Sequence, residues 1–123
     1  MACLSWTFHS PSLRMATHAF VVLPEYPAQP QNTLILLHGL SGACDTWNRR
    51  TSIERYAQKH NLAVIMPEVQ RSWYTDMVYG LPYFTFITDE LPRLAANTLR
   101  VPVDPAHLYV GGLSMGGYGA LKC

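Results

Sequence analysis

Three short apolar runs constrain the fold of this chain more than any other feature. They are TLILLHG at residues 33–39, LAVIMP at 62–67 and HLYVGG at 107–112. A continuous apolar run of this length, closed by glycine or proline, is typical of a strand that is covered on both faces. Such strands belong to parallel sheets with helices on both sides. The runs therefore predict an α/β fold.

The segments between these runs carry helical patterns. In residues 51–61, apolar side chains recur at i, i+3 and i+4 from Ile53, and we expect Asn61 to end the helix. Residues 84–99 repeat the pattern, with Pro92 expected in the first turn or at a kink. Strands and helices that alternate in this way favour parallel strands joined by right-handed crossovers.

The amino-terminal part has a different character. Residues 3–10 and 18–24 are rich in β-branched and aromatic residues and flank the turn-like SPSLRMA, which predicts an antiparallel hairpin. Three prolines in residues 24–32 predict a surface connection, because proline removes a donor from the ladder. A chain of 123 residues is long enough for one ordinary domain and too short for two. We expect a single domain over residues 1–123.

Composition and charge exclude several classes of protein. The net charge of +1 gives no basic surface for nucleic acid, and no apolar stretch approaches the ~18 residues of a membrane span. The start of the chain lacks the pattern of a secretory signal. Cys3, Cys44 and Cys123 are odd in number and lack metal-type spacing, so we interpret them as free thiols without a function. We therefore expect a cytoplasmic protein without a metal, and without nucleic-acid or membrane partners.

The strongest motif is GLSMG at residues 112–116, which fits G-x-S-x-G. It directly follows an apolar run and opens a helical pattern, the context that a nucleophile elbow requires. A nucleophilic serine must stand clear of its own backbone, so the chain turns sharply and glycines flank the turn. Dinucleotide and phosphate-loop patterns do not fit this glycine-rich stretch. The motif favours a catalytic Ser114, and a purely structural turn is the alternative.

A second segment, HGLSGAC at residues 38–44, supports that interpretation. In hydrolases with the elbow, a backbone N–H from the loop after this strand stabilises the oxyanion. His38 lies at the end of the strand, so we expect it to fix the loop by hydrogen bonding rather than to act as the general base. The other four histidines give no argument for a place beside the serine.

The combined motifs carry a resemblance to a known family. HGLSG, NLAVIMP, SWYTDMVYG and GLSMGGYGA together resemble the esterase D-type carboxylesterases, above all the small bacterial tributyrin and acetyl esterases. S-formylglutathione hydrolases, feruloyl esterases and mycolyl transferases are broader relatives. The resemblance implies an α/β-hydrolase fold, Ser114 as nucleophile, and the N–H groups of Met115 and Leu40 as oxyanion donors. It implies an ester substrate and no metal or organic cofactor.

The chain departs from this family in one respect. In α/β-hydrolases the acid and the histidine of the triad follow the nucleophile along the chain. Here all four aspartates precede Ser114, no histidine follows it, and Asp104 is expected to open the turn into the elbow strand. We therefore expect the amino-terminal half of a serine esterase, truncated after the elbow and inactive by itself. A truncated non-catalytic product, an acyltransferase and an S-formylglutathione-type thioesterase remain alternatives.

An aromatic segment follows the second apolar run. Trp73, Tyr74 and Tyr79 lie after LAVIMP, at the carboxyl end of a predicted strand, where open α/β sheets bind ligands. These rings predict a wall around a short acyl or alcohol group. Such a wall favours esters with short acyl chains, from acetyl through butyryl. Alternatively, the rings cover the core beneath a long loop.

Overall fold

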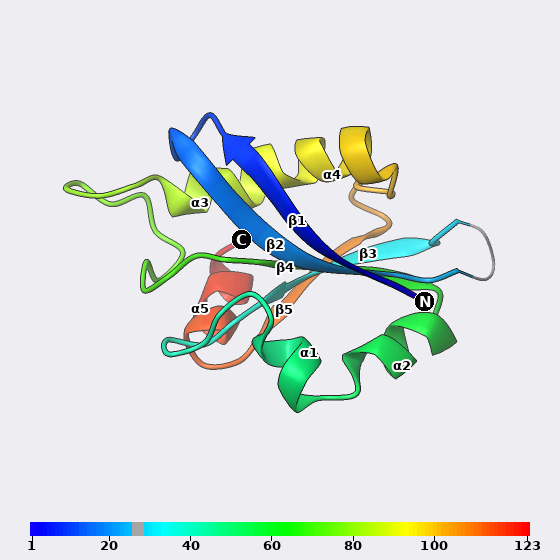
Figure 1. The fold of residues 1–123 in the computed structure, drawn as a ribbon. Coiled ribbons are helices and arrows are strands. Elements are labelled where there is room, and N and C mark those ends of the chain that lie inside the picture. Colours follow the sequence, from blue (N-terminus) through cyan, green and yellow to red (C-terminus); the bar gives the residue numbers. More distant parts are fainter. Residues whose placement is uncertain (26–28) are drawn as a thin grey trace.

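A computed structural model describes residues 1–25 and 29–123. The chain forms a five-stranded sheet with the order β1-β2-β4-β3-β5 (Figure 1). The predicted surface connection includes residues 26–28, which lie outside the described residues. The strands are β1 (Ala2–Ser10), β2 (Met15–Leu23), β3 (Asn32–Leu37), β4 (Leu62–Pro67) and β5 (Leu108–Gly112). The helices are α1 (Thr46–Arg50), α2 (Ile53–Lys59), α3 (Tyr83–Thr85), η1 (Phe86–Glu90), α4 (Leu91–Leu99) and α5 (Met115–Lys122).

The three predicted apolar runs form the parallel part of the sheet. β3 lies between β4 and β5 and pairs parallel with both. β1 and β2 form the predicted antiparallel hairpin, and β2 joins the sheet antiparallel to β4. The carboxyl ends of β3 and β5 consequently lie together, because Leu37 pairs with Gly112.

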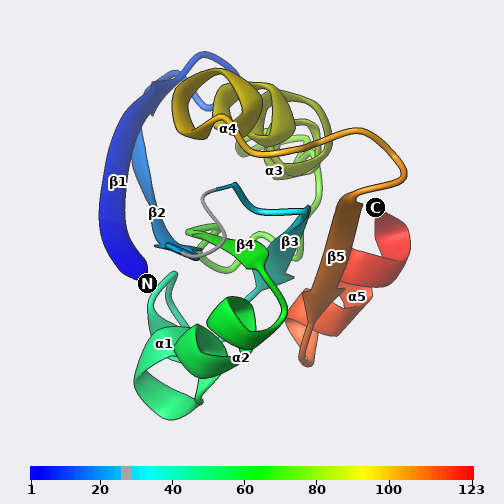
Figure 2. The same cartoon turned by 90° about the vertical axis from the view of Figure 1, so that its right-hand side faces the viewer.

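Helices cover both faces of the sheet, as continuous apolar strands require. α1 and α2 lie on one face, where Ala57 packs among Val22, Val64 and Met66 (Figures 1 and 2). The segment from α3 to α4 lies on the other face, and Met115 of α5 belongs to the same core cluster as α4. The fold is therefore a three-layer α/β arrangement, as predicted.

The helices differ in detail from the sequence prediction. The long helix near residues 84–99 begins at Tyr83 and contains one π-helical segment, η1. Pro92 is the second residue of α4, directly after η1. Because the helical run continues from η1 into α4, its missing N–H leaves a carbonyl of the preceding turn without a helical donor. α1 was not predicted, because five residues are too few for helical periodicity to show. Asn61 follows the end of α2 with a φ of 48°, as expected of a residue that stops a helix.

β5 is the edge strand of the sheet. Tyr109 and Val110 are exposed there, because the residues described here place no strand on the far side of β5. Asp104 opens the turn into β5: its carbonyl accepts hydrogen bonds from the N–H groups of His107 and Leu108, both at 3.0 Å. None of the helices among the described residues is both long and apolar enough to cross a membrane.

Candidate active site

Ser114 occupies the turn between β5 and α5 in a strained conformation. Its φ is 58° and its ψ is −120°, a region that residues with a Cβ rarely adopt. The side chain is exposed, and no group in the described part of the chain donates to or accepts from its Oγ. This geometry is the sharp strand-to-helix turn of a nucleophile elbow.

The glycines of the motif are required by close backbone contacts. A Cβ placed on Gly112 would lie 2.3 Å from the carbonyl carbon of Gly116. A Cβ on Gly116 would lie 2.2 Å from the carbonyl oxygen of Leu37, at the end of β3. Both distances are far below van der Waals contact, and the opposing atoms belong to the backbone. Glycine at these positions lets α5 start directly against β3 and fixes the direction of the serine.

The loop after β3 lies beside Ser114. A Cβ on Gly39 would be 3.7 Å from the Cβ of Ser114, so the backbone of this loop approaches the serine directly. Within the described residues, the N–H groups of Leu40 and Met115 have no hydrogen-bond acceptor. The two predicted oxyanion donors are thus both unpaired in this structure. A cavity of about 340 Å³ opens here, lined by Gly39, Leu40, Ser41, Gly42, Ala43, Thr46, Arg49, Arg50, Leu113 and Ser114.

His38 holds this loop in place, as the sequence predicted. The ring is 1 % exposed, and its Nδ1 donates to the Gly39 carbonyl at 2.8 Å. Nε2 lies 3.2 Å from the Val69 nitrogen, whose N–H it accepts in the neutral form, and 3.3 Å from Glu68 Oε1, to which it donates in the charged form. The Tyr74 hydroxyl donates to the His38 carbonyl at 2.8 Å. Both ring nitrogens of His38 are therefore occupied, which leaves neither for Ser114.

Electrostatics couple His38 to Glu68. Burial alone would lower the pKa of His38, but hydrogen bonds to Glu68 and Gly39 raise it above its usual value. Burial alone would raise the pKa of Glu68, but hydrogen bonds from His38 and from the N–H groups of Gln70 and Cys44 lower it to about 2. Glu68 is therefore a carboxylate at neutral pH, and it ties the loop after β3 (residues 38–44) to the end of β4.

Comparison with known proteins decides the family. The model of the Esterase family, described as "Putative esterase", matches residues 10–123. The chain belongs to this family. It is 30 % identical over 133 residues to the acetyl esterase of Caldicellulosiruptor saccharolyticus, which covers 99 % of the chain and 50 % of that enzyme. It is 30 % identical over 113 residues to the S-formylglutathione hydrolase of Bos taurus, which covers 73 % of the chain and 39 % of that enzyme.

Solved structures agree with this assignment and give the fold. The serine hydrolase FphF of Staphylococcus aureus, described as fluorophosphonate-binding, superimposes with a TM-score of 0.92 at 40 % identity. That match covers 98 % of this chain and 50 % of FphF. The fold is thus the α/β-hydrolase fold, and the chain spans about half the length of the curated relatives that it matches most fully.

The predicted aromatic wall is not assembled around Ser114 in this member of the family. Tyr74 is fully buried, with its ring against Gly119 and its hydroxyl on His38, so it is a core residue and does not line the cavity. Trp73 packs edge-on against Tyr118 with ring centroids 5.8 Å apart, and Tyr79 is fully exposed. None of the three lines the cavity at Ser114. The alternative, that such rings cover the core beneath a loop, holds for Tyr74.

Sequence reasoning missed the basic side of the cavity. Arg49 and Arg50, at the end of α1, line the same cavity as Ser114. Asp45 accepts from Arg49 Nε at 2.8 Å, whereas Arg50 has no ion-pair or hydrogen-bond partner among the described residues. The pair of arginines directly before Thr51 is the only sequence signal, and it gains meaning once α1 is placed beside the loop.

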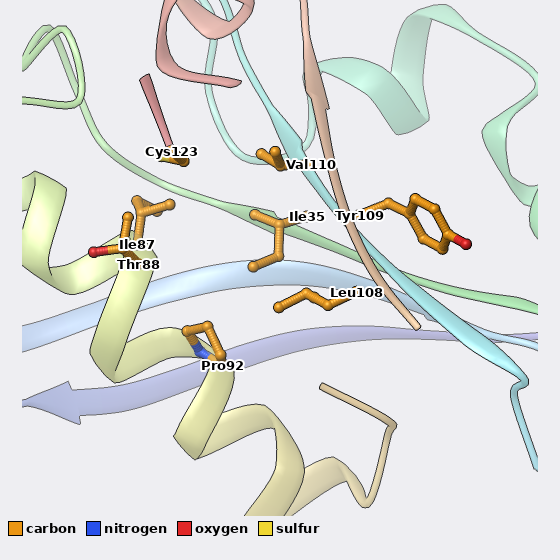
Figure 3. A pocket seen from close by; sticks show the side chains of 8 residues that line it. All are labelled: Ile35, Ile87, Thr88, Pro92, Leu108, Tyr109, Val110 and Cys123. Atoms are coloured by element: carbon orange, nitrogen blue, oxygen red, sulfur yellow. The ribbon is translucent and has the colours of Figure 1, made fainter. Parts of the chain in front are cut away.

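A second pocket lies away from the serine. It has a volume of about 190 Å³ and lies along β5, where Ile87, Thr88 and Pro92 face Leu108 and Val110 (Figure 3). Its lining is mainly apolar, and Ser114 is not among the residues that form it. This pocket therefore belongs to the open edge of the sheet and not to the candidate active site.

Proposed function

We propose that this chain carries the nucleophile of a serine carboxylesterase that hydrolyses short-chain acyl esters through an acyl-enzyme at Ser114. The single observation that carries the proposal is the strained turn at Ser114 beside two unpaired backbone N–H groups, those of Leu40 and Met115. Two such donors stabilise a developing oxyanion by several kcal/mol. The family match supports the same class of enzyme.

In the proposed mechanism, Ser114 Oγ attacks the ester carbonyl carbon and transfers its proton to a general base. The carbonyl oxygen becomes an oxyanion between the N–H groups of Leu40 and Met115. The C–O bond to the alcohol then breaks, the base returns the proton to the leaving oxygen, and water hydrolyses the acyl-enzyme by the same steps in reverse. The described residues place no histidine on Ser114, so the base must come from outside them.

We accordingly propose that the 123-residue chain by itself lacks useful esterase activity. A serine hydroxyl without a base is a weak nucleophile, even in a formed oxyanion hole. A chimera tests the assignment of the nucleophile. In it, residues 1–123 are joined to the part of S. aureus FphF that this chain does not match, with intact FphF as the reference for folding and activity.

The expected result is hydrolysis of p-nitrophenyl acetate and stoichiometric labelling of the chimera by a fluorophosphonate. Ser114→Ala should abolish both, whereas Ser41→Ala, at a serine that lines the same cavity, should leave the labelling intact. A loss of less than tenfold on Ser114→Ala would contradict the assignment. Tenfold is only about 1.4 kcal/mol of barrier, too little for the loss of a nucleophile.

The size of the cavity supports a short acyl group. Its volume of about 340 Å³ is near the lower end of the range of roughly 300–1,000 Å³ for ligand pockets. In a series of p-nitrophenyl esters, the folded chimera should hydrolyse the short acyl chains, from acetyl through butyryl, faster than longer ones. A preference for long chains over butyryl would overturn this part of the proposal.

A second candidate substrate class is the S-acylglutathione thioesters. Arg49 and Arg50 line the cavity, and an arginine is a good partner for the carboxylates that glutathione carries. In the chimera, Arg50→Gln should raise KM for S-formylglutathione and leave p-nitrophenyl acetate hydrolysis unchanged. Equal effects on the two substrates would remove this candidate.

A further inference from the structure

Three potential metal ligands from distant parts of the sequence meet at the loop after β3 (residues 38–44), which carries the proposed oxyanion donor Leu40. A ring nitrogen of His18, the Sγ of Cys44 and a carboxylate oxygen of Glu68 all lie within 4.8 Å of one another. His18 comes from β2, Cys44 is the last residue of the loop after β3, and Glu68 directly follows β4. None of the three belongs to the lining of the cavity at Ser114.

The backbone holds the three residues together. The Glu68 N–H donates to the His18 carbonyl at 3.1 Å, which extends the pairing of β2 with β4 by one step. The Cys44 N–H donates to Glu68 Oε2 at 3.0 Å. Hydrogen bonds from main-chain N–H groups therefore join Glu68 to His18 and Cys44 to Glu68. The three residues are held near one another by the backbone as well as by their side-chain rotamers.

Each side chain has capacity left for a ligand. No described residue forms a hydrogen bond with the His18 ring, which is exposed and free to turn toward the cluster. Glu68 Oε1 already faces the Gln70 N–H and His38 Nε2. Among the described residues, Glu68 Oε2 accepts only from the Cys44 N–H and has a second lone pair for a ligand. Burial, together with the charges of Glu68 and Asp45, raises the pKa of the Cys44 thiol to about 11. The free protein thus keeps Cys44 protonated beside an anionic carboxylate.

We propose that His18, Cys44 and Glu68 form a binding site for a divalent cation of the zinc class. An imidazole, a thiolate and a carboxylate are the ligands that zinc takes, whereas calcium and magnesium prefer oxygen ligands alone. Zinc–ligand distances of about 2.0–2.3 Å place ligand atoms roughly 3–4 Å apart, so the cluster closes with small side-chain movements. A water molecule completes the fourth position. Binding replaces the S–H proton of Cys44, which goes to solvent, with the metal.

The site would act on the loop of residues 38–44 through Glu68 and Cys44. Glu68 interacts with His38, and Cys44 ends the small-residue segment that carries Leu40. A bound cation would tie this segment to β2 and β4 and stabilise the native chain, because the unfolded chain does not bring residues 18, 44 and 68 together. This cluster could not be predicted from the sequence, because the three ligands lie far apart and do not form a spaced motif.

Cobalt(II) titration tests the site on the 123-residue chain. The background variant carries Cys3→Ser and Cys123→Ser, which removes the two exposed thiols, and is kept reduced. We expect a thiolate-to-cobalt charge-transfer band that saturates at one equivalent and is displaced by Zn²⁺. Adding Cys44→Ser should abolish the band. Adding His18→Ala should weaken Co²⁺ binding by at least about tenfold.

His9→Ala is the matched control, because His9 is an exposed histidine on the neighbouring strand β1. It should leave cobalt binding unchanged. Zn²⁺ should raise the melting temperature of the background variant and of His9→Ala, but not that of His18→Ala, which changes only an exposed side chain and should fold normally. The proposal is wrong if no saturable band forms, if the band survives Cys44→Ser, or if His9→Ala and His18→Ala behave alike.

Discussion

Adding a single methyl group at Gly116 should distort the elbow, and the same change at Gly117 should not. A Cβ on Gly116 would lie 2.2 Å from the Leu37 carbonyl oxygen and 2.9 Å from that of His38, where ordinary contact begins at 3.4 Å. A Cβ on Gly117 meets its nearest atom, the Gly112 carbonyl oxygen, at 3.5 Å. Neither glycine has a positive φ, so alanine fits the local backbone at both positions.

The expected magnitudes follow from these contacts. Overpacking against backbone typically costs about 1–3 kcal/mol. The Leu37 carbonyl also accepts a hydrogen bond from Trp47 Nε1 at 3.1 Å. Displacing this carbonyl would weaken that bond and cost about 1 kcal/mol more. Gly116→Ala should therefore lower the free energy of unfolding by about 2–4 kcal/mol. Gly117→Ala should raise it by about 0.5–1 kcal/mol, because alanine loses less backbone entropy in a helix.

Urea denaturation followed by tryptophan fluorescence measures both effects, under conditions where sedimentation shows a monomer. Trp47 reports directly on the end of β3. The two midpoints should move in opposite directions from that of the wild type. If Gly116→Ala is as stable as Gly117→Ala, then the close approach of α5 to Leu37 does not define the elbow, and our account of the motif is wrong.

Three further predictions concern other parts of the molecule. Tyr74→Phe should cost about 1–3 kcal/mol in urea denaturation, because the buried His38 carbonyl loses its side-chain donor. The pKa of Glu68 is lowered from 4.5 to about 2, so its contribution to stability is present above pH 4.5 and is lost as the pH falls toward 2. Glu68→Gln should flatten this acid limb in thermal scans between those pH values. Val110→Lys should reduce self-association in sedimentation velocity, because it places a charge on the open edge of β5.

The arrangement of strands could be predicted because its signals are local. Each apolar run became a strand, the turn at Asp104 formed where expected, and Ser114 lies in the strained turn that the glycines at 112 and 116 predicted. These features depend on residue types within a few positions of one another. Glycine at a forced contact and β-branched residues in a buried strand leave few alternatives.

The environment of the site could not be predicted, because it depends on which distant segments meet. The sequence placed Tyr74 in a substrate wall, but its ring fills the space beside Gly119 in the core. Arg50 reaches the cavity only because α1, too short to detect, turns the chain back beside the loop. Glu68 gave no signal at all, since its partners His38 and Cys44 lie more than twenty positions away.

The position of the elbow also determines when it can form during folding. Its shape depends on the carbonyls of Leu37 and His38, yet the strand that leads into it is held by pairs such as Thr33 with Leu108, from distant parts of the sequence. We expect contacts of this kind to form late in folding, because the entropy of closing the long loop is lost before the contacts compensate for it. In a chain that has formed only its hairpin and local helices, we expect the backbone of Ser114 to be unstrained. We therefore expect the strained turn at Ser114 to form only when the parallel sheet is complete.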